Sequence, residues 1–159
     1  MVSNGVCMGR VSIVYLTKYG NNRMCMEYLG ERLQGLGHEV IIHSIDETKP
    51  DNVPRADLYV FSTPVRMGKL PGKMKRFAKR FSSRGGRYAL VVTHASDENA
   101  GKWNPDRTVA AMSELLREGG MGPTMDELRV RMKDMKGPPE DNYRGKLDSL
   151  AERISNLLS

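Results

Sequence analysis

The sequence contains few cysteines and no long run of hydrophobic residues. Its two cysteines, Cys7 and Cys25, are far apart, so they form neither a metal-ligand pattern nor a disulfide framework, and we expect no metal site. No apolar segment approaches the length of a membrane-spanning helix, and the first residues lack the pattern of a secretory signal. We therefore expect a cytoplasmic protein without a transmembrane segment, for which peripheral contact with a membrane stays open.

The common nucleotide-binding fingerprints are also missing. The sequence has neither a Gly-x-Gly-x-x-Gly motif nor a Gly-x-x-x-x-Gly-Lys-Ser/Thr motif. A dinucleotide site and a nucleoside-triphosphate site therefore both lack their signature. If the chain binds a phosphate, the phosphate belongs to a smaller molecule.

Positive charge, in contrast, is abundant. The chain carries 25 Lys and Arg against 19 Asp and Glu, which gives a net charge of +6 and favours an acidic partner. Several basic residues fall in one segment: Lys69, Lys73, Lys75, Arg76, Lys79 and Arg80. Because no zinc-finger, helix-turn-helix or ribonucleoprotein motif accompanies them, we interpret them as a solvated surface rather than a nucleic-acid interface.

Hydrophobic periodicity predicts an alternation of strands and helices over residues 10–159, which we expect to form one domain after a flexible extension of residues 1–9. The predicted strands are 11–16, 39–45, 57–62 and 87–93. Helical apolar spacing follows the first, third and fourth of these strands and returns from about Tyr143 to the end. Between 121 and 136, the alternation of Leu128, Val130 and Met132 favours a fifth strand, with an amphipathic helix as the alternative.

Such an order implies an α/β fold with a parallel sheet covered by helices on both faces. Ligands of open parallel sheets bind beyond the carboxyl ends of the strands. Three loops leave those ends here, at 17–22, 63–70 and 94–104, and they are rich in Gly, Asn, Ser and Thr. We expect Cys25 to be buried on a helix, and His38 and His43, beside the second strand, to lie at the surface.

The first of these loops has the composition of an anion site. Thr17 offers a hydroxyl, Asn21 and Asn22 offer amide donors, and Gly20 allows a tight turn and a close approach of a phosphate to the backbone. An ordinary strand-to-helix turn, with Asn22 as the helix cap, explains the same residues. The loop alone does not decide between the two interpretations.

Residues 15–22, Tyr-Leu-Thr-Lys-Tyr-Gly-Asn-Asn, resemble the phosphate loop of the flavodoxin family. Thr17, Gly20 and Asn21 match the family pattern, whereas Tyr19 and Asn22 stand where Thr or Ser is usual. Met67-Gly68-Lys69 is similar to a loop of short-chain flavodoxins. Val65-Arg66-Met67-Gly68 resembles the loop of the menaquinone-dependent protoporphyrinogen oxidase branch. The resemblance covers residues 10–118, but the segment 121–143 lacks the long basic and aromatic insertion of that oxidase branch.

The resemblance implies a flavodoxin-like three-layer sandwich with a five-stranded parallel sheet in the order 2-1-3-4-5. It also implies that the chain binds flavin mononucleotide (FMN) with residues of all three loops. The phosphate loop would contribute Thr17, Lys18, Tyr19, Gly20, Asn21 and Asn22. The second loop would contribute Thr63, Pro64, Val65, Arg66, Met67 and Gly68, and the third His94, Ala95, Ser96 and Trp103.

Within this implied site, a few residues have specific expected roles. Met67 is the main candidate for contact with the flavin ring, because a thioether packs well on aromatic faces. Trp103 is either a second stacking residue or a partly buried surface residue. His94 is either a proton donor or, more commonly for such a residue, a group that caps the backbone. No catalytic residue can be named from the sequence.

Three functions are compatible with this site. We favour an electron carrier whose redox partner is an acidic protein. An FMN-dependent oxidoreductase acting on a quinone-like or porphyrinogen-like small molecule is the alternative, and the third is a flavodoxin-like scaffold that has lost FMN. Lys18, Arg66 and Lys69 would stabilise the reduced, anionic flavin, so we expect a less reducing couple than that of an acidic flavodoxin.

Overall fold

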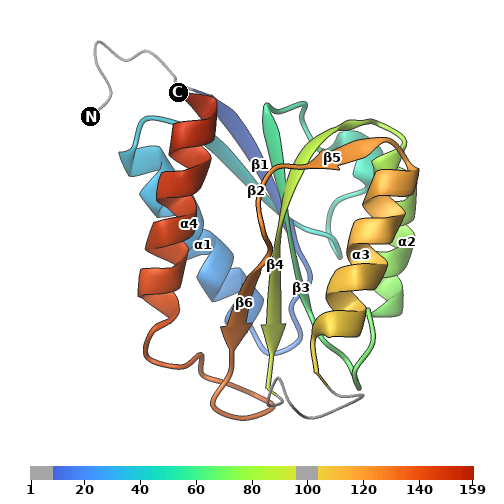
Figure 1. The fold of residues 1–159 in the computed structure, drawn as a ribbon, viewed down its shortest axis with the longest axis vertical. Coiled ribbons are helices and arrows are strands. Elements are labelled where there is room, and N and C mark those ends of the chain that lie inside the picture. The colour runs from blue at the N-terminus through green and yellow to red at the C-terminus, as the bar shows by residue number, and fades with distance from the viewer. Residues whose placement is uncertain (1–8, 96–103) are drawn as a thin grey trace.

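The computed structural model describes residues 9–95 and 104–159. These residues form a parallel sheet between two pairs of helices (Figure 1). The strands are β1 (Arg10–Tyr15), β2 (Glu39–Ser44), β3 (Leu58–Pro64), β4 (Gly86–His94), β5 (Met121–Pro123) and β6 (Leu128–Arg131). The helices are α1 (Asn21–Gly35), α2 (Gly72–Ser82), α3 (Asp106–Glu118) and α4 (Tyr143–Leu158), with a short 3-10 turn, η1, at Pro50–Asn52.

The strand order is β2-β1-β3-β4-β5, as predicted, and every pair of neighbouring strands is parallel. The predicted fifth strand is divided into two. Both β5 and β6 pair with β4, β5 at the beginning of β4 and β6 at its end, so the sheet has six strands instead of five. The alternation at 128–132 is that of a strand, because Val130 and Met132 are buried against the α1 and α4 side of the sheet.

Each face of the sheet has its own hydrophobic core. Successive side chains of a strand point to opposite faces, and β1 follows this rule, with Val11 and Ile13 in the core under α1 and α4 and Val14 in the core under α2 and α3. Both sides of the central strands are therefore apolar. Buried aromatic rings gather on the α2 side, where the Phe81 ring packs edge-on against Tyr59 and Phe61 at centroid distances of 4.9 and 5.3 Å.

The prediction for Cys25 is confirmed, and one histidine prediction is wrong. Cys25 is fully buried on α1, and burial raises the pKa of its thiol to about 11. His38 is not a surface residue: it is 4% exposed because α4 covers it, and its Nε2 lies 2.9 Å from Ser155 Oγ. Burial lowers the pKa of His38. Cys7 lies outside the described residues, whereas Gly9 is buried and its carbonyl accepts the N–H of Glu39.

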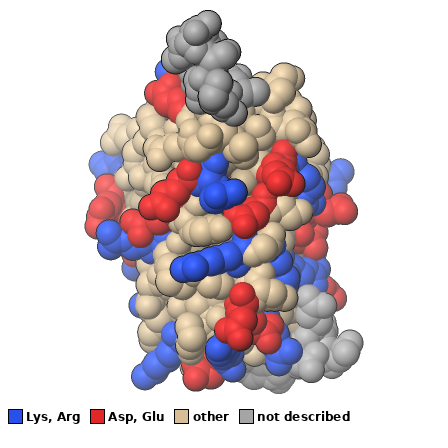
Figure 2. All heavy atoms as spheres, turned by 90° about the vertical axis from the view of Figure 1, so that its left-hand side faces the viewer, with Lys and Arg blue, Asp and Glu red and all other residues tan. Residues whose placement is uncertain are grey.

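Charged side chains are distributed unevenly over the surface. Figure 2 shows positive and negative side chains interspersed on the side of α1 and α4, where Arg23 pairs with Glu27 and Arg32 with Asp148. Helix α2 differs, because it carries five Lys and Arg residues and no acidic residue. Within 9–95 and 104–159, no helix is long and apolar enough to span a membrane.

Candidate functional site

Three strand ends meet at the lower edge of the sheet in Figure 1, and Asn22 connects them. Its side chain is 2% exposed and enters the interior from the first turn of α1. Asn22 Nδ2 donates to Ser62 Oγ of β3 at 3.1 Å, and Asn22 Oδ1 accepts from Thr93 Oγ1 of β4 at 2.5 Å. The side-chain amide is therefore used inside the protein, and the backbone N–H of Asn22 is the group that remains for a ligand.

The loop between β1 and α1 has the geometry of an anion site. Gly20, directly before α1, has a φ of 88°, and the Thr17 hydroxyl accepts its N–H at 2.9 Å. Apart from its chain neighbours, no heavy atom lies within 4 Å of the position that a Cβ on Gly20 would occupy, so the backbone is open to a ligand there. The N–H groups of a first helical turn have no partner within the helix and favour negative charge.

A second segment, which the sequence did not indicate, lies against this loop. Asn21 Nδ2 donates to the carbonyl oxygen of Lys136 at 3.0 Å, across 115 residues of sequence. The Tyr19 ring has two cations near it, with Lys18 Nζ at 5.3 Å and Lys136 Nζ at 5.9 Å from the ring centroid. Both distances are within the range of cation–π attraction. Lys136 thus adds a positive charge beside the predicted phosphate loop.

The loop after β3 ends in a tight hairpin turn. The N–H groups of Arg66 and Lys69 each donate to the carbonyl of the other residue at 2.9 Å. The two residues between them, Met67 and Gly68, have φ angles of 52° and 76°, which is the pattern of a type I′ turn. A positive φ is unusual for Met and costs energy. The Met67 side chain is 73% exposed, so this strained residue projects into the solvent.

The remaining predicted site residues differ in how far the structure describes them. Thr63 is buried, Pro64 and Val65 are half-buried, and the Val65 N–H donates to the Thr93 carbonyl at 2.9 Å, which holds the second loop beside β4. His94 is 4% exposed at the end of β4, and Ala95 is exposed. Ser96 and Trp103 lie outside the described residues, so the predictions made for them stay predictions.

Four basic side chains lie along the first two loops and the segment at Lys136. Lys18, Arg66, Lys69 and Lys136 are all exposed. None of the four makes an ion pair with another residue of 9–95 or 104–159. No group of three or more His, Cys, Asp or Glu in these same ranges could hold a metal ion. The edge therefore combines an open backbone anion site, an exposed Met and unpaired cations, which suits an anionic ligand with a large flat body.

Comparison with known proteins agrees with this geometry. The chain is similar to a curated flavodoxin of Aquifex aeolicus, at 31% identity over 114 residues, which is 68% of this chain and 59% of the relative. The match thus spans about three-fifths of that relative. Among solved structures, Flavodoxin 1 of Bacillus cereus has a TM-score of 0.76 at 17% identity, covering 94% of this chain and 99% of the other.

An archaeal flavodoxin has a TM-score of 0.73 at 20% identity, covering 94% of this chain and 98% of the other. These two structures support the fold alone, because their identity is low. The family assignment comes from the sequence, since residues 12–118 match the family model described as a flavodoxin domain. That stretch covers well over half of the chain and contains all three loops of the predicted site. The chain therefore belongs to the flavodoxin family.

Proposed function

We propose that the chain binds FMN at the carboxyl edge of its sheet and serves as an electron carrier. The observation that carries this proposal is the open backbone at Gly20, beside the unpaired N–H groups of the first turn of α1. Those groups, with Lys18 and Lys136, would hold the phosphate. When bound, FMN supplies reversible electron transfer, and the residues of the three loops orient its ring.

The second loop supports the same proposal. Met67 is held in a left-handed conformation at the tip of a hairpin, where its thioether is free to pack on a flat ring. Backbone strain of this kind is often found at ligand sites. Cationic side chains on the rim, Arg66 and Lys69, would favour the anionic reduced flavin and would dock an acidic redox partner. His94 and Ala95 would border the ring from the third loop.

Titration of the purified protein with FMN tests the cofactor. We expect quenching of FMN fluorescence with a stoichiometry near one, and weaker binding of riboflavin because it lacks the phosphate. The Gly20→Val variant should lose affinity for FMN much more than for riboflavin, because Val is strained at a φ of 88° and its side chain would fill the space beside the backbone. A matched Gly120→Val change, at another glycine with a positive φ (109°) and open space around its Cβ position, should leave both affinities unchanged. A colourless protein that fails to quench FMN would instead support the scaffold without a cofactor.

A second candidate is an FMN-dependent oxidoreductase acting on a quinone-like or porphyrinogen-like molecule. The loop Val65-Arg66-Met67-Gly68 favours it, because this loop resembles that of the oxidase branch and leaves Met67 accessible. Two rates distinguish the candidates: turnover with a menaquinone analogue and reduction by an NAD(P)H-dependent flavodoxin reductase. Fast reduction by the reductase with negligible quinone turnover supports the carrier, and the reverse supports the oxidoreductase.

A further inference from the structure

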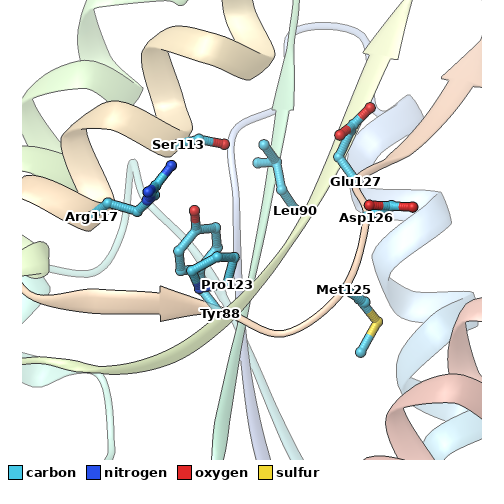
Figure 3. Close-up of a pocket in the computed structure, with 8 residues that line it drawn as sticks. All are labelled: Tyr88, Leu90, Ser113, Arg117, Pro123, Met125, Asp126 and Glu127. Atoms are coloured by element: carbon cyan, nitrogen blue, oxygen red, sulfur yellow. The ribbon is translucent and has the colours of Figure 1, made fainter.

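A hollow of about 180 Å³ lies where the edge strand of the sheet is interrupted (Figure 3). Strand β5 ends at Pro123 and β6 begins at Leu128. Between them the N–H and hydroxyl of Thr124 both donate to the Tyr88 carbonyl, at 3.1 and 2.9 Å, after which the chain leaves the edge of β4. The hollow opens between this connection and α3.

A buried hydroxyl without a hydrogen bond lies behind one wall of the hollow. Tyr88 is 3% exposed, and its hydroxyl has no hydrogen-bond partner among the described residues. An unpaired buried hydroxyl destabilises the folded protein, because it has lost its hydrogen bonds to water. In Figure 3 the Tyr88 hydroxyl is directed toward Ser113 and Arg117 of α3. A hydrogen-bond acceptor that entered between these side chains would give this hydroxyl a partner.

The neighbours of this hydroxyl indicate which ligand would fit. Ser113 and Arg117 are four residues apart on α3, so they lie on the same face of the helix. The Arg117 side chain is exposed and makes no ion pair with another residue of the described chain. A guanidinium and two hydroxyls match a carboxylate, which accepts up to four hydrogen bonds and binds Arg in a planar pair.

The rest of the hollow limits the size and character of the ligand. Leu90, Pro123 and Met125 provide an apolar lining, and Asp126 and Glu127 stand on the far side of Leu90 from Arg117 in Figure 3. Glu127 is already paired with Arg129 at 3.1 Å, whereas Asp126 is exposed. A short carbon chain with one carboxylate, with or without an amine at its other end, matches this lining.

We propose that this hollow is a binding site for a small organic carboxylate. Tyr88, Ser113 and Arg117 bind the carboxylate, and the apolar lining holds the short carbon chain. The site is separate from the proposed flavin site. Tyr88 and His94 are six residues apart on β4, which corresponds to about 20 Å at the rise of a strand. Binding here therefore does not depend on whether the chain binds FMN.

A titration with carboxylates followed by ¹H–¹⁵N NMR tests the proposal on the full-length protein. The probes are acetate, butyrate and γ-aminobutyrate, with sodium chloride at equal ionic strength. We expect saturable shifts of the Gly122 amide and the Arg117 Nε–H group with butyrate and not with chloride. Stronger binding of γ-aminobutyrate than of butyrate supports a contact with Asp126 as well, and shifts that also appear with chloride would overturn the proposal.

Three variants make the test specific. Arg117→Gln should weaken butyrate binding at least tenfold, and Tyr88→Phe about fivefold or more, because each removes a donor to the carboxylate. Arg107→Gln, also on an exposed part of α3, is the matched control and should bind as the unmodified protein does. Tyr88→Phe should also melt at the same or a higher temperature, since it removes an unpaired hydroxyl. Equal butyrate affinity in all three variants would overturn the proposal, whatever the outcome of FMN titration.

Discussion

The first two loops of the proposed flavin site are built in opposite ways. The loop from Thr17 to Asn22 is anchored to the interior by side chains, since the Asn22 side chain forms hydrogen bonds with those of Ser62 and Thr93. The hydrogen bonds of the turn at Arg66–Lys69 within the described residues are two backbone hydrogen bonds across it, and the turn presents an exposed Met in a strained conformation. The first loop is preorganised for a small charged group, whereas the second can adjust to a larger surface.

This difference has a physical cause. A phosphate is bound by several N–H groups at fixed distances, so a rigid loop binds it with higher affinity because less entropy is lost on binding. A flat ring is bound by dispersion over an area, and the flexible thioether of Met67 suits such contact. We therefore expect changes in the first loop to lower both folding stability and cofactor affinity. Changes in the second loop should separate these two quantities.

The largest effect is expected for Asn22→Ala. This change leaves the Ser62 and Thr93 hydroxyls without their amide partner in the interior, where both residues are buried. Leaving such groups unpaired should lower the free energy of unfolding by about 2–3 kcal/mol, as measured by urea denaturation. The loop should also lose its fixed geometry, so FMN affinity should fall more than tenfold in a quenching titration.

Arg23→Ala is the control for Asn22→Ala. It lies in the same helical turn and removes only an exposed ion pair with Glu27, which should change stability by less than about 1 kcal/mol. If Asn22→Ala were no more harmful than Arg23→Ala, the internal hydrogen bonds of Asn22 would not be what holds the loop.

Met67→Gly should have effects of opposite sign on stability and on affinity. Glycine adopts the positive φ of this position without strain, so the free energy of unfolding should rise by about 1 kcal/mol. Loss of the thioether should weaken FMN binding by roughly two- to tenfold, which corresponds to about 0.4–1.4 kcal/mol. Urea denaturation of the protein without FMN and FMN titration measure the two quantities separately.

Gly68→Ala is the matched change for Met67→Gly. Gly68 has a φ of 76°, so an added Cβ brings strain and should lower stability by about 1 kcal/mol. A lower stability for both variants would show that Met67 is not strained and would remove the contrast between the two loops.

The architecture of the sheet could be predicted because its signals are local. The apolar runs at 11–16 and 87–93 and the helical spacing of Met74, Phe77 and Phe81 all correspond to buried faces in the structure. The division of the fifth strand could not be predicted, because it depends on the hydrogen bonds of Thr124 to the Tyr88 carbonyl, 36 residues away. No local pattern distinguishes such an interruption from a short turn.

The position of the candidate site could be predicted from the sequence, but the long-range hydrogen bonds that hold its loops could not. Parallel topology alone brings the loops after β1, β3 and β4 to one edge. Asn22, however, was interpreted as a donor to a ligand or as a helix cap, whereas its side chain reaches Ser62 and Thr93, 40 and 71 residues away. The contact between Asn21 and Lys136 is equally long-range. A short polar residue gives the same sequence pattern whether its side chain points into the interior or toward a ligand. Only the tertiary structure distinguishes the two cases.

Charge on the second loop should act on the redox potential rather than on binding. Lys69→Gln removes a cation from the rim, so the anionic, fully reduced flavin is stabilised less. We expect the potential of the second one-electron step to fall by roughly 30 mV, which is half of the 59 mV that corresponds to a tenfold change in equilibrium constant. Redox titration of the FMN complex measures it, with Lys69→Arg as the control that keeps the charge. An unchanged potential in Lys69→Gln would mean that this cation is too far from the ring or too well screened to matter.

The smallest effect is expected for Lys136→Gln, which tests whether Lys136 acts on the first loop through its charge or through its backbone hydrogen bond. Lys136 contributes two things there: its carbonyl accepts from Asn21, and its ammonium lies 5.9 Å from the Tyr19 ring centroid. Lys136→Gln keeps the carbonyl and removes the ammonium, so FMN affinity should fall only two- to fivefold, as for an exposed charge worth about 0.5–1 kcal/mol. The loss should shrink as salt is added, because exposed charges are screened, and riboflavin binding should not change, because riboflavin has no phosphate. A loss that persists at high salt, or that riboflavin shares, would place Lys136 among the structural supports of the rigid loop instead of among its charges.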